Sequence, residues 1–80
     1  MTNTESTPRA HNDGGTYTVI AFAETRNHWG IAITRWTTYR NEVRYEVKRV
    51  SDDNRAVRLH HFATEAEARA YANKMWRRDR

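Results

Sequence analysis

The chain lacks cysteine altogether in its 80 residues. This absence excludes disulfide bonds, thiolate metal ligands and thiol nucleophiles together, and it is compatible with a reducing compartment. No apolar run approaches the roughly 20 residues that a membrane-spanning helix needs, and the first residues lack the apolar stretch of a signal peptide. These absences predict a cytoplasmic protein that does not contact a membrane.

Glycine and serine are scarce, and their positions exclude common catalytic and nucleotide-binding motifs. Gly14-Gly15 is not followed by the Lys-Ser or Lys-Thr of a phosphate-binding loop, and Gly30 lies within a predicted strand. Ser6 and Ser51 lack the flanking glycines of a hydrolase nucleophile. A single sheet with one helix also offers little of the enclosed pocket that acid–base catalysis needs. We therefore expect a protein without enzymatic activity or a cofactor.

The neighbouring histidines His60 and His61 are the one pair that suggests a metal site. Consecutive residues of a strand point to opposite faces of the sheet, so these rings are poorly placed to share one ion. The chain has no histidines at the spacings HxH or HxxxH. We expect no metal site, and we interpret His60 as a pH-dependent charge beside basic residues.

Lysine is nearly absent, with 2 Lys against 12 Arg, and the formal net charge is +4. The planar guanidinium group suits recognition of phosphate and carboxylate, although a GC-rich genome would by itself favour arginine. A basic chain attracts anionic partners. The composition therefore predicts binding to a nucleic acid or to an acidic protein surface.

Residues 1–16 contain the only proline and show no apolar periodicity. This composition is typical of a disordered N-terminal tail. The remainder, residues 17–80, carries 13 basic and 8 acidic residues, so the positive charge belongs to a single small domain rather than to the tail.

Four segments rich in β-branched and aromatic residues, joined by short polar turns, predict an antiparallel β-meander. The third has the clearest alternation, with Val43, Tyr45 and Val47 interleaved with charged residues. The first is apolar on both parities, which is typical of a central strand. The predicted strands are residues 17–25, 29–39, 42–48 and 56–62.

After the fourth strand the apolar period changes to that of an α-helix. Thr64 and Glu67 have the spacing of a capping box, and residues 68, 71, 72 and 75 fall on one stripe. The sequence thus predicts an α+β fold, namely a four-stranded antiparallel β-meander with one C-terminal helix packed on one face, in the order ββββα.

One helix covers only one face of such a sheet and leaves the other face for binding. By strict alternation this face carries Trp36, Arg44, Lys48, Arg58 and His60. A tryptophan among cations suits stacking on bases or anchoring of a protein contact. A bulge after Ile33 would instead turn Trp36 into the core and Arg35 outward, and both placements stay open.

A second candidate binding patch lies on the predicted helix and consists of Arg69, Trp76, Arg77 and Arg80. Trp76 borders the apolar stripe. Its ring either closes the edge of the core with the indole N–H toward solvent, or joins these arginines in a basic-aromatic surface.

The pattern Phe62-x-Thr64-x-x-Glu67-Ala68 after a β-meander resembles the entry into the helix of the Arm-type DNA-binding domains of tyrosine recombinases. In that family the sheet lies in the major groove. The resemblance implies that DNA would be contacted by Arg44, Lys48 and Arg58.

The predicted face also carries two carboxylates, Glu42 and Glu46, which would repel phosphates. This mixed charge suits a protein partner better than a phosphate backbone. In size and composition the chain is similar to small accessory proteins of phages and mobile elements, which include anti-CRISPR inhibitors. That similarity implies binding to a nucleic-acid-processing complex and obstruction of its target.

We therefore expect a non-catalytic binding protein of phage or mobile-element type. It would bind an acidic surface of a nucleic-acid-processing complex and modulate or inhibit that complex. Direct DNA binding by the basic sheet face is the alternative. The same face is also suited to self-association, so the chain is expected to be a monomer or a homodimer.

Overall fold

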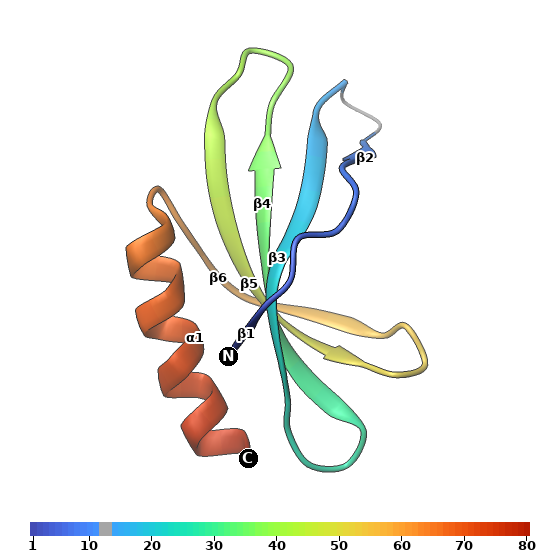
Figure 1. Ribbon diagram of the computed structural model, residues 1–80, viewed down its shortest axis with the longest axis vertical. Helices are drawn as coiled ribbons and strands as arrows, with labels where there is room; N and C mark the ends of the chain where they lie inside the picture. The colour runs from blue at the N-terminus through green and yellow to red at the C-terminus, as the bar shows by residue number, and fades with distance from the viewer. Residues whose placement is uncertain (12–13) are drawn as a thin grey trace.

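The chain forms a six-stranded antiparallel sheet with one helix against it (Figure 1). The computed structural model describes residues 1–11 and 14–80. The strands lie in the order β1-β3-β4-β5-β6, and β2 also pairs with β3. The elements are β1 (Thr2–Asn3), β2 (Arg9–Ala10), β3 (Thr16–Glu24), β4 (Trp29–Thr37), β5 (Val43–Ser51), β6 (Ala56–Phe62) and α1 (Glu65–Asp79). The predicted α+β class and the antiparallel arrangement of the sheet are confirmed.

The sheet has two more strands than the four that the sequence predicts, because the N-terminal segment pairs with β3. β1 pairs in the register Thr2↔Phe22, and β2 pairs in the register Arg9↔Tyr17. Backbone groups make these bonds, so a polar segment without apolar periodicity can join the sheet. Two paired strands thus replace part of the free tail predicted for residues 1–16, of which residues 12 and 13 lie outside the described residues.

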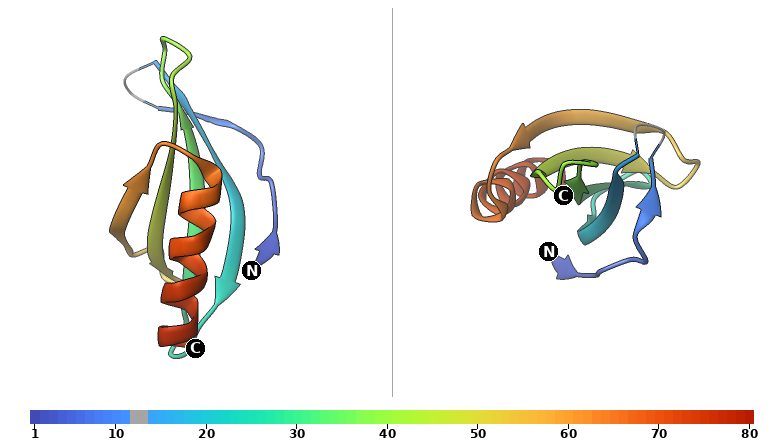
Figure 2. Two further views of the ribbon diagram at one scale, coloured as in Figure 1. Left: turned by 90° about the vertical axis from the view of Figure 1, so that its left-hand side faces the viewer. Right: turned by 90° about the horizontal axis from the view of Figure 1, so that it is seen from above.

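The hydrophobic core lies between the sheet and α1. Ile31, Ile33 and Val47 are fully buried on the helix side of β4 and β5, and they pack with Ala72 and Met75 of α1. Fully burying such an aliphatic side chain contributes about 1.5–3 kcal/mol. Because the alanines of α1 are small, the helix packs closely on the sheet, and it covers one side of the sheet only (Figure 2).

The helix begins at the predicted capping residue. Thr64 Oγ1 accepts a hydrogen bond from the Glu67 amide at 3.3 Å and donates one to Glu67 Oε1 at 2.8 Å. A cap of this kind contributes about 1 kcal/mol. At the other end the Arg80 amide donates to the Trp76 carbonyl oxygen at 2.9 Å. Both ends of α1 are therefore closed by local hydrogen bonds.

The register between β4 and β5 decides where Trp36 points. The two strands pair without interruption along the whole of β4, so no bulge follows Ile33. Since Ile33 is buried against α1, alternation turns Trp36 away from the helix. Of the two placements that the sequence leaves open for Trp36, the structure has the one on the uncovered face.

The register between β5 and β6 contains a bulge. Val47 pairs with His60 and Lys48 pairs with Arg58, which leaves Leu59 as an extra residue in β6. A bulge of one residue reverses the alternation beyond it. His60 therefore lies on the helix side of the sheet, and the prediction that it shares the uncovered face with Arg58 is wrong.

Phe22 lies over Gly30 near the end of the sheet where the β3–β4 turn is located. A Cβ atom at Gly30 would lie 2.5 Å from two atoms of the Phe22 ring and 2.9 Å from the carbonyl oxygen of Ala23. Real Cβ atoms do not approach other heavy atoms so closely. Packing therefore favours glycine at position 30, since the Cβ atom of any other residue would overlap the Phe22 ring.

Replacement of Gly30 by alanine tests this packing. We expect Gly30→Ala to lower the free energy of unfolding by about 1–3 kcal/mol, the usual cost of overpacking. Urea denaturation followed by tryptophan fluorescence measures the loss. In the double variant Phe22→Leu/Gly30→Ala, the smaller side chain should make the added methyl group less costly than it is beside Phe22. A Gly30→Ala protein as stable as the wild type would show that Phe22 does not restrict this position.

Candidate binding surface

The side of the sheet that α1 does not cover, called the open face from here on, gathers aromatic and charged side chains. Its central residues are Tyr17, Trp36, Arg44, Glu46, Lys48, Arg58 and His61. Trp36 lies opposite both Tyr17 and Arg44 in the strand registers. Cross-strand neighbours on one face have Cβ atoms about 4.5–5.5 Å apart, so these side chains contact one another. Four of the five sheet residues predicted to share this face are brought together on it.

Glu46 lies at the centre of the open face, and only 5% of its side chain is exposed. Its carboxylate accepts a hydrogen bond from the Trp36 indole N–H at 3.3 Å and pairs with the Lys48 ammonium at 3.1 Å and with the Arg58 guanidinium. Burying a carboxylate without partners would be strongly unfavourable, so these three donors stabilise Glu46 in its buried position. Glu46 thus connects side chains from three strands in one arrangement.

The Trp36 ring is half-buried between side chains from both neighbouring strands. The Tyr17 ring of β3 has its centroid 4.8 Å away, and the Lys48 ammonium of β5 lies 5.5 Å from the Trp36 centroid. The His11 ring lies edge-on to the Trp36 ring, with the two ring centroids 4.9 Å apart. A ring enclosed in this way offers little area to a stacked base. The arrangement favours recognition through the surrounding charges.

Arg44 is exposed, as is Arg58 in the same group. It forms no ion pair within residues 1–11 and 14–80, whereas Lys48 and Arg58 both pair with Glu46. Arg44 lines a surface pocket of about 290 Å³ together with Arg58 and His61. The pocket therefore presents a guanidinium group whose hydrogen-bonding capacity is not used inside the described fold.

The structure changes the interpretation of the two carboxylates that the sequence places on this face. Glu46 is covered by its donors and presents almost no negative charge to solvent. Glu42 precedes β5 and lies in the β4–β5 turn, where its amide donates to Thr38 Oγ1 at 3.1 Å. Glu46 therefore adds almost no negative charge at the surface, whereas the exposed Glu42 lines a hollow with Arg44 and His61 at one end of the face. With Arg44, Lys48 and Arg58 the face keeps a net positive charge.

His11, Tyr17 and His61 belong to this surface but were missed in the sequence. The register of β3 shifts between Val19 and Ala21, which brings Tyr17 opposite Trp36. His61 faces Glu46 because of the bulge in β6. Neither shift leaves a mark in the apolar pattern, so the only available signal was the aromatic character of Tyr17 at the start of an apolar strand.

His60 packs on the helix side of the sheet instead. Its ring centroid lies 4.6 Å from that of Phe62 and 5.6 Å from that of Tyr71. These contacts are with residues that pack against the core. His60 therefore belongs to the seam between β6 and α1 and is separated from Arg44 and Arg58 by the sheet.

Trp76 closes the edge of the core. Its indole N–H donates to the Glu24 carbonyl oxygen at 3.1 Å, and its ring packs against the core cluster. The Arg80 guanidinium lies 4.9 Å from the ring centroid, and Arg77 Nε donates to the Asn73 carbonyl oxygen at 3.3 Å. The structure thus has the first of the two arrangements considered for Trp76, except that the N–H meets β3 rather than solvent.

Arg69 also has a role within the fold. Its Nε atom pairs with Glu65 Oε2 at 2.8 Å, and its Nη1 atom donates to Asn3 Oδ1 at 2.8 Å. The second contact joins α1 to β1. The four helix residues predicted to bind a partner therefore make contacts within the fold, and they do not belong to the open face.

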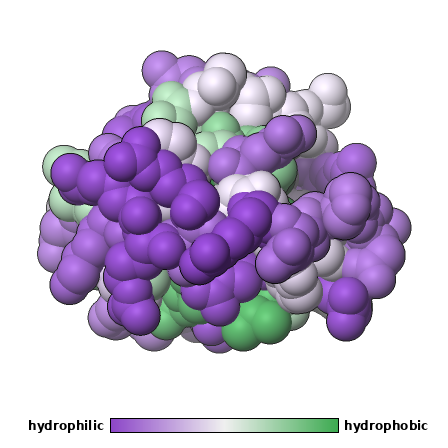
Figure 3. Space-filling view, turned by 90° about the horizontal axis from the view of Figure 1, so that it is seen from below, coloured by the Kyte–Doolittle hydropathy of each residue, from purple (hydrophilic) through white to green (hydrophobic). Residues whose placement is uncertain are grey.

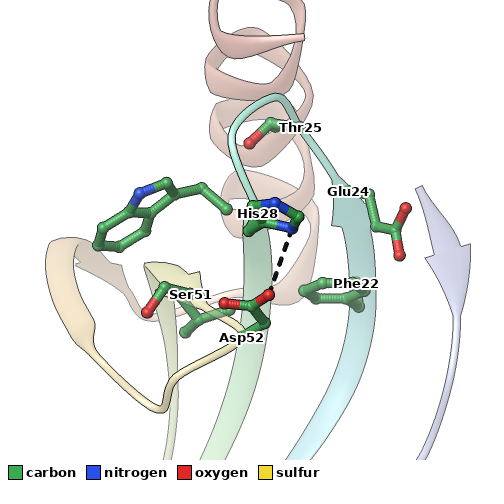
Figure 4. A pocket seen from close by; sticks show the side chains of 8 residues that line it. Phe22, Glu24, Thr25, His28, Ser51 and Asp52 are labelled. Carbon is green, nitrogen blue, oxygen red and sulfur yellow. Dashed lines mark ion pairs between the residues drawn. The ribbon is translucent and has the colours of Figure 1, made fainter.

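A second hollow lies between the β3–β4 and β5–β6 turns, where His28 Nδ1 and Asp52 Oδ2 are 3.3 Å apart (Figure 4). Ser51 lines the same hollow, but its hydroxyl donates to Asp53 and accepts from the Arg55 amide at 3.1 Å. The Ser51 hydroxyl and Arg55 hold the pKa of Asp53 below its usual range. The Ser51 hydroxyl therefore forms hydrogen bonds within its own turn and not with His28. The end of the molecule that contains this hollow is largely hydrophilic when seen from below (Figure 3).

In the described part of the chain, no three His, Asp or Glu side chains gather closely enough to hold a metal ion. Within the same residues, no helix has the length and apolar character needed to cross a membrane. Neither the family models, nor the curated proteins, nor the solved structures compared with the chain match it. The geometry of the open face therefore carries the functional argument.

Replacement of Glu46 tests whether it organises the open face. We expect Glu46→Ala to lower the free energy of unfolding by about 1–2 kcal/mol, through loss of charged hydrogen bonds. The cost stays below the 3–5 kcal/mol or so of a fully buried pair, because Lys48 and Arg58 are 27% and 67% exposed and can be hydrated. Urea denaturation measures the loss, and the Trp36 indole N–H resonance should shift as its acceptor disappears.

The exposed Glu42 provides the matched control, since Glu42→Ala also removes one carboxylate. It should leave both the stability and the Trp36 resonance nearly unchanged. If Glu46→Ala behaved in the same way, Glu46 would have no organising role.

Proposed function

We propose that the protein is a non-catalytic binding protein that docks its open face on an acidic surface of a nucleic-acid-processing complex and thereby modulates or inhibits that complex. The observation that carries the proposal is the buried Glu46, which holds Lys48, Arg58 and Trp36 in place and leaves Arg44 exposed beside them. Arginine and tryptophan are enriched among residues that dominate binding energies. A surface organised before binding loses less conformational entropy when it binds.

The charge of the open face supports an anionic partner. Three of its ionised side chains, Arg44, Lys48 and Arg58, are positive, and the negative Glu46 lies beneath them. Complementary charge steers encounter and excludes wrong partners. Polymerases and nucleases hold divalent metal ions at sites where carboxylates are the usual protein ligands, so complexes of this kind carry acidic clefts. A small basic protein that occupied such a cleft would obstruct the nucleic acid.

The number of available cations favours a protein partner over a nucleic acid. Proteins that bind DNA through its backbone use many phosphate contacts, often about 6–10. On the open face Lys48 and Arg58 already share Glu46, and Arg44 alone is unpaired within the described residues. The half-buried Trp36 offers little stacking area in compensation. The similarity to small phage and mobile-element accessory proteins points to the same class of partner.

Affinity purification from lysate of the source cells tests this proposal. The tagged wild-type protein should recover one defined nucleic-acid-processing complex, and Arg44→Glu should reduce recovery at least about tenfold, as expected for loss of a central charged contact. Arg78→Glu is the control, because it reverses the same charge at an exposed position on α1. Both variants are first compared by thermal unfolding.

Two outcomes would contradict the proposal. One is recovery of no such complex by the wild-type protein. The other is equal recovery by Arg44→Glu and Arg78→Glu, which would place the contact away from the open face.

Direct binding of DNA by the open face is the second candidate, because burial of Glu46 removes a negative charge that would oppose phosphates. If Arg44, Lys48 and Arg58 each contact one phosphate, the logarithm of the binding constant should fall with the logarithm of salt concentration with a slope of about −2 to −3. Fluorescence anisotropy with a labelled duplex measures this slope. In Arg44→Ala it should become shallower by about 1. An absence of binding at about 100 mM salt would exclude this candidate.

A further inference from the structure

The pocket beside Arg44 has a chemistry that the proposed docking does not by itself explain. It has a volume of about 290 Å³, at the small end of ligand sites. Its lining includes His11, Trp36, Arg44, Glu46, Arg58 and His61. Most of these side chains have polar ends, so the pocket is suited to a polar group larger than a water molecule.

The carboxylate in this lining is already satisfied. Glu46 receives the Trp36 N–H, Lys48 and Arg58, so a cation entering the pocket would have to displace a donor already in place. Such a displacement would leave Lys48 or Arg58 without its partner. The pocket is therefore a poor site for a cation.

The donors in the lining point to an anion. Arg44 is exposed and unpaired within the described residues, and a guanidinium group can donate two parallel hydrogen bonds to one carboxylate. Arg58 stands on the neighbouring strand and keeps part of its guanidinium exposed. An anion between the two would add hydrogen bonds without breaking the pairs on Glu46.

The charge around the pocket favours an anion. Arg44 and Arg58 are positive, and the negative Glu46 pairs with Lys48 as well as with Arg58, so a net positive charge remains. A protein partner supplies such an anion as a carboxylate with a single negative charge. A phosphate monoester carries about −1.5 to −2 at neutral pH and would place excess negative charge near Glu46.

We infer that this pocket takes a single carboxylate side chain, aspartate or glutamate, from the partner protein, with Arg44 as the main contact. The inference rests on the proposed function and adds the group that is recognised. Arg58 is the second contact, and Trp36 and Lys48 are positioning residues that act through Glu46. The acidic surface of the partner thus supplies one inserted carboxylate, and the rest of the open face lies against it.

A titration with small probes tests the pocket without the partner. A short glycine peptide with one aspartate, blocked at both ends, is added to the isotope-labelled full chain while the Arg44 Nε–H and Trp36 indole N–H resonances are followed. We expect saturable shifts with a dissociation constant in the millimolar range, since one ion pair without supporting contacts binds weakly. The same peptide with asparagine in place of aspartate should produce no saturable shift.

Matched variants separate a site from general attraction. Arg44→Ala should weaken binding of the aspartate peptide at least about tenfold, and Arg78→Ala, which removes the same charge from α1, should not. Glu46→Gln tests the positioning role: it should move the Trp36 resonance in the free protein and weaken peptide binding, whereas a merely structural carboxylate would change stability alone. Equal weakening by Arg44→Ala and Arg78→Ala would overturn the inference.

Four further outcomes would also overturn it. Tighter binding of inorganic phosphate than of the aspartate peptide would assign the pocket to phosphate, and tighter binding of a short oligonucleotide would assign it to nucleic acid. Shifts that follow protein concentration without any peptide would assign it to a second copy of the chain. If the peptide fails to bind while Arg44→Glu still releases the complex, the proposed function stands and the carboxylate pocket does not.

Discussion

The open face depends on one buried charge. Glu46 stands in the middle of a sheet face that no helix covers, yet its side chain is almost fully removed from water. A carboxylate in that position is stable only when donors surround it, and the donors come from Trp36, Lys48 and Arg58. The donors that the buried Glu46 requires are therefore also side chains that a partner would meet.

The single helix explains why such an arrangement is possible. α1 buries the apolar side of β4 and β5, and the opposite side keeps polar residues that long side chains cover. Ala32 and Thr34 are buried on that opposite side without any helix above them. Side chains such as Lys and Arg shield small residues with their aliphatic parts while their charged ends reach water. The sheet is thus closed by hydrophobic packing on one side and by an ionic cluster on the other.

Much of this architecture is readable from the sequence, and the exceptions have a common cause. Alternation in β4 and β5 correctly places Trp36, Arg44 and Lys48 on one face, because these strands pair without a register shift. His60 was misplaced because one extra residue in β6 reverses its side, and apolar periodicity does not reveal bulges. β1 and β2 were missed because backbone hydrogen bonds hold them. The burial of Glu46 depends on contacts between strands, which alternation within one strand does not describe.

Glu46 also limits what the open face can bind. By neutralising part of the charge of Lys48 and Arg58 it lowers the attraction for a long polyanion, whose affinity grows with each phosphate contacted. In return it holds Lys48 and Arg58 in fixed positions, and fixed donors discriminate between anions by shape and charge. A face built from free lysines would bind any polyanion, whereas one ordered around a carboxylate favours a partner that presents a single acid at the right place. The physical balance of this cluster therefore favours specificity over strength of attraction.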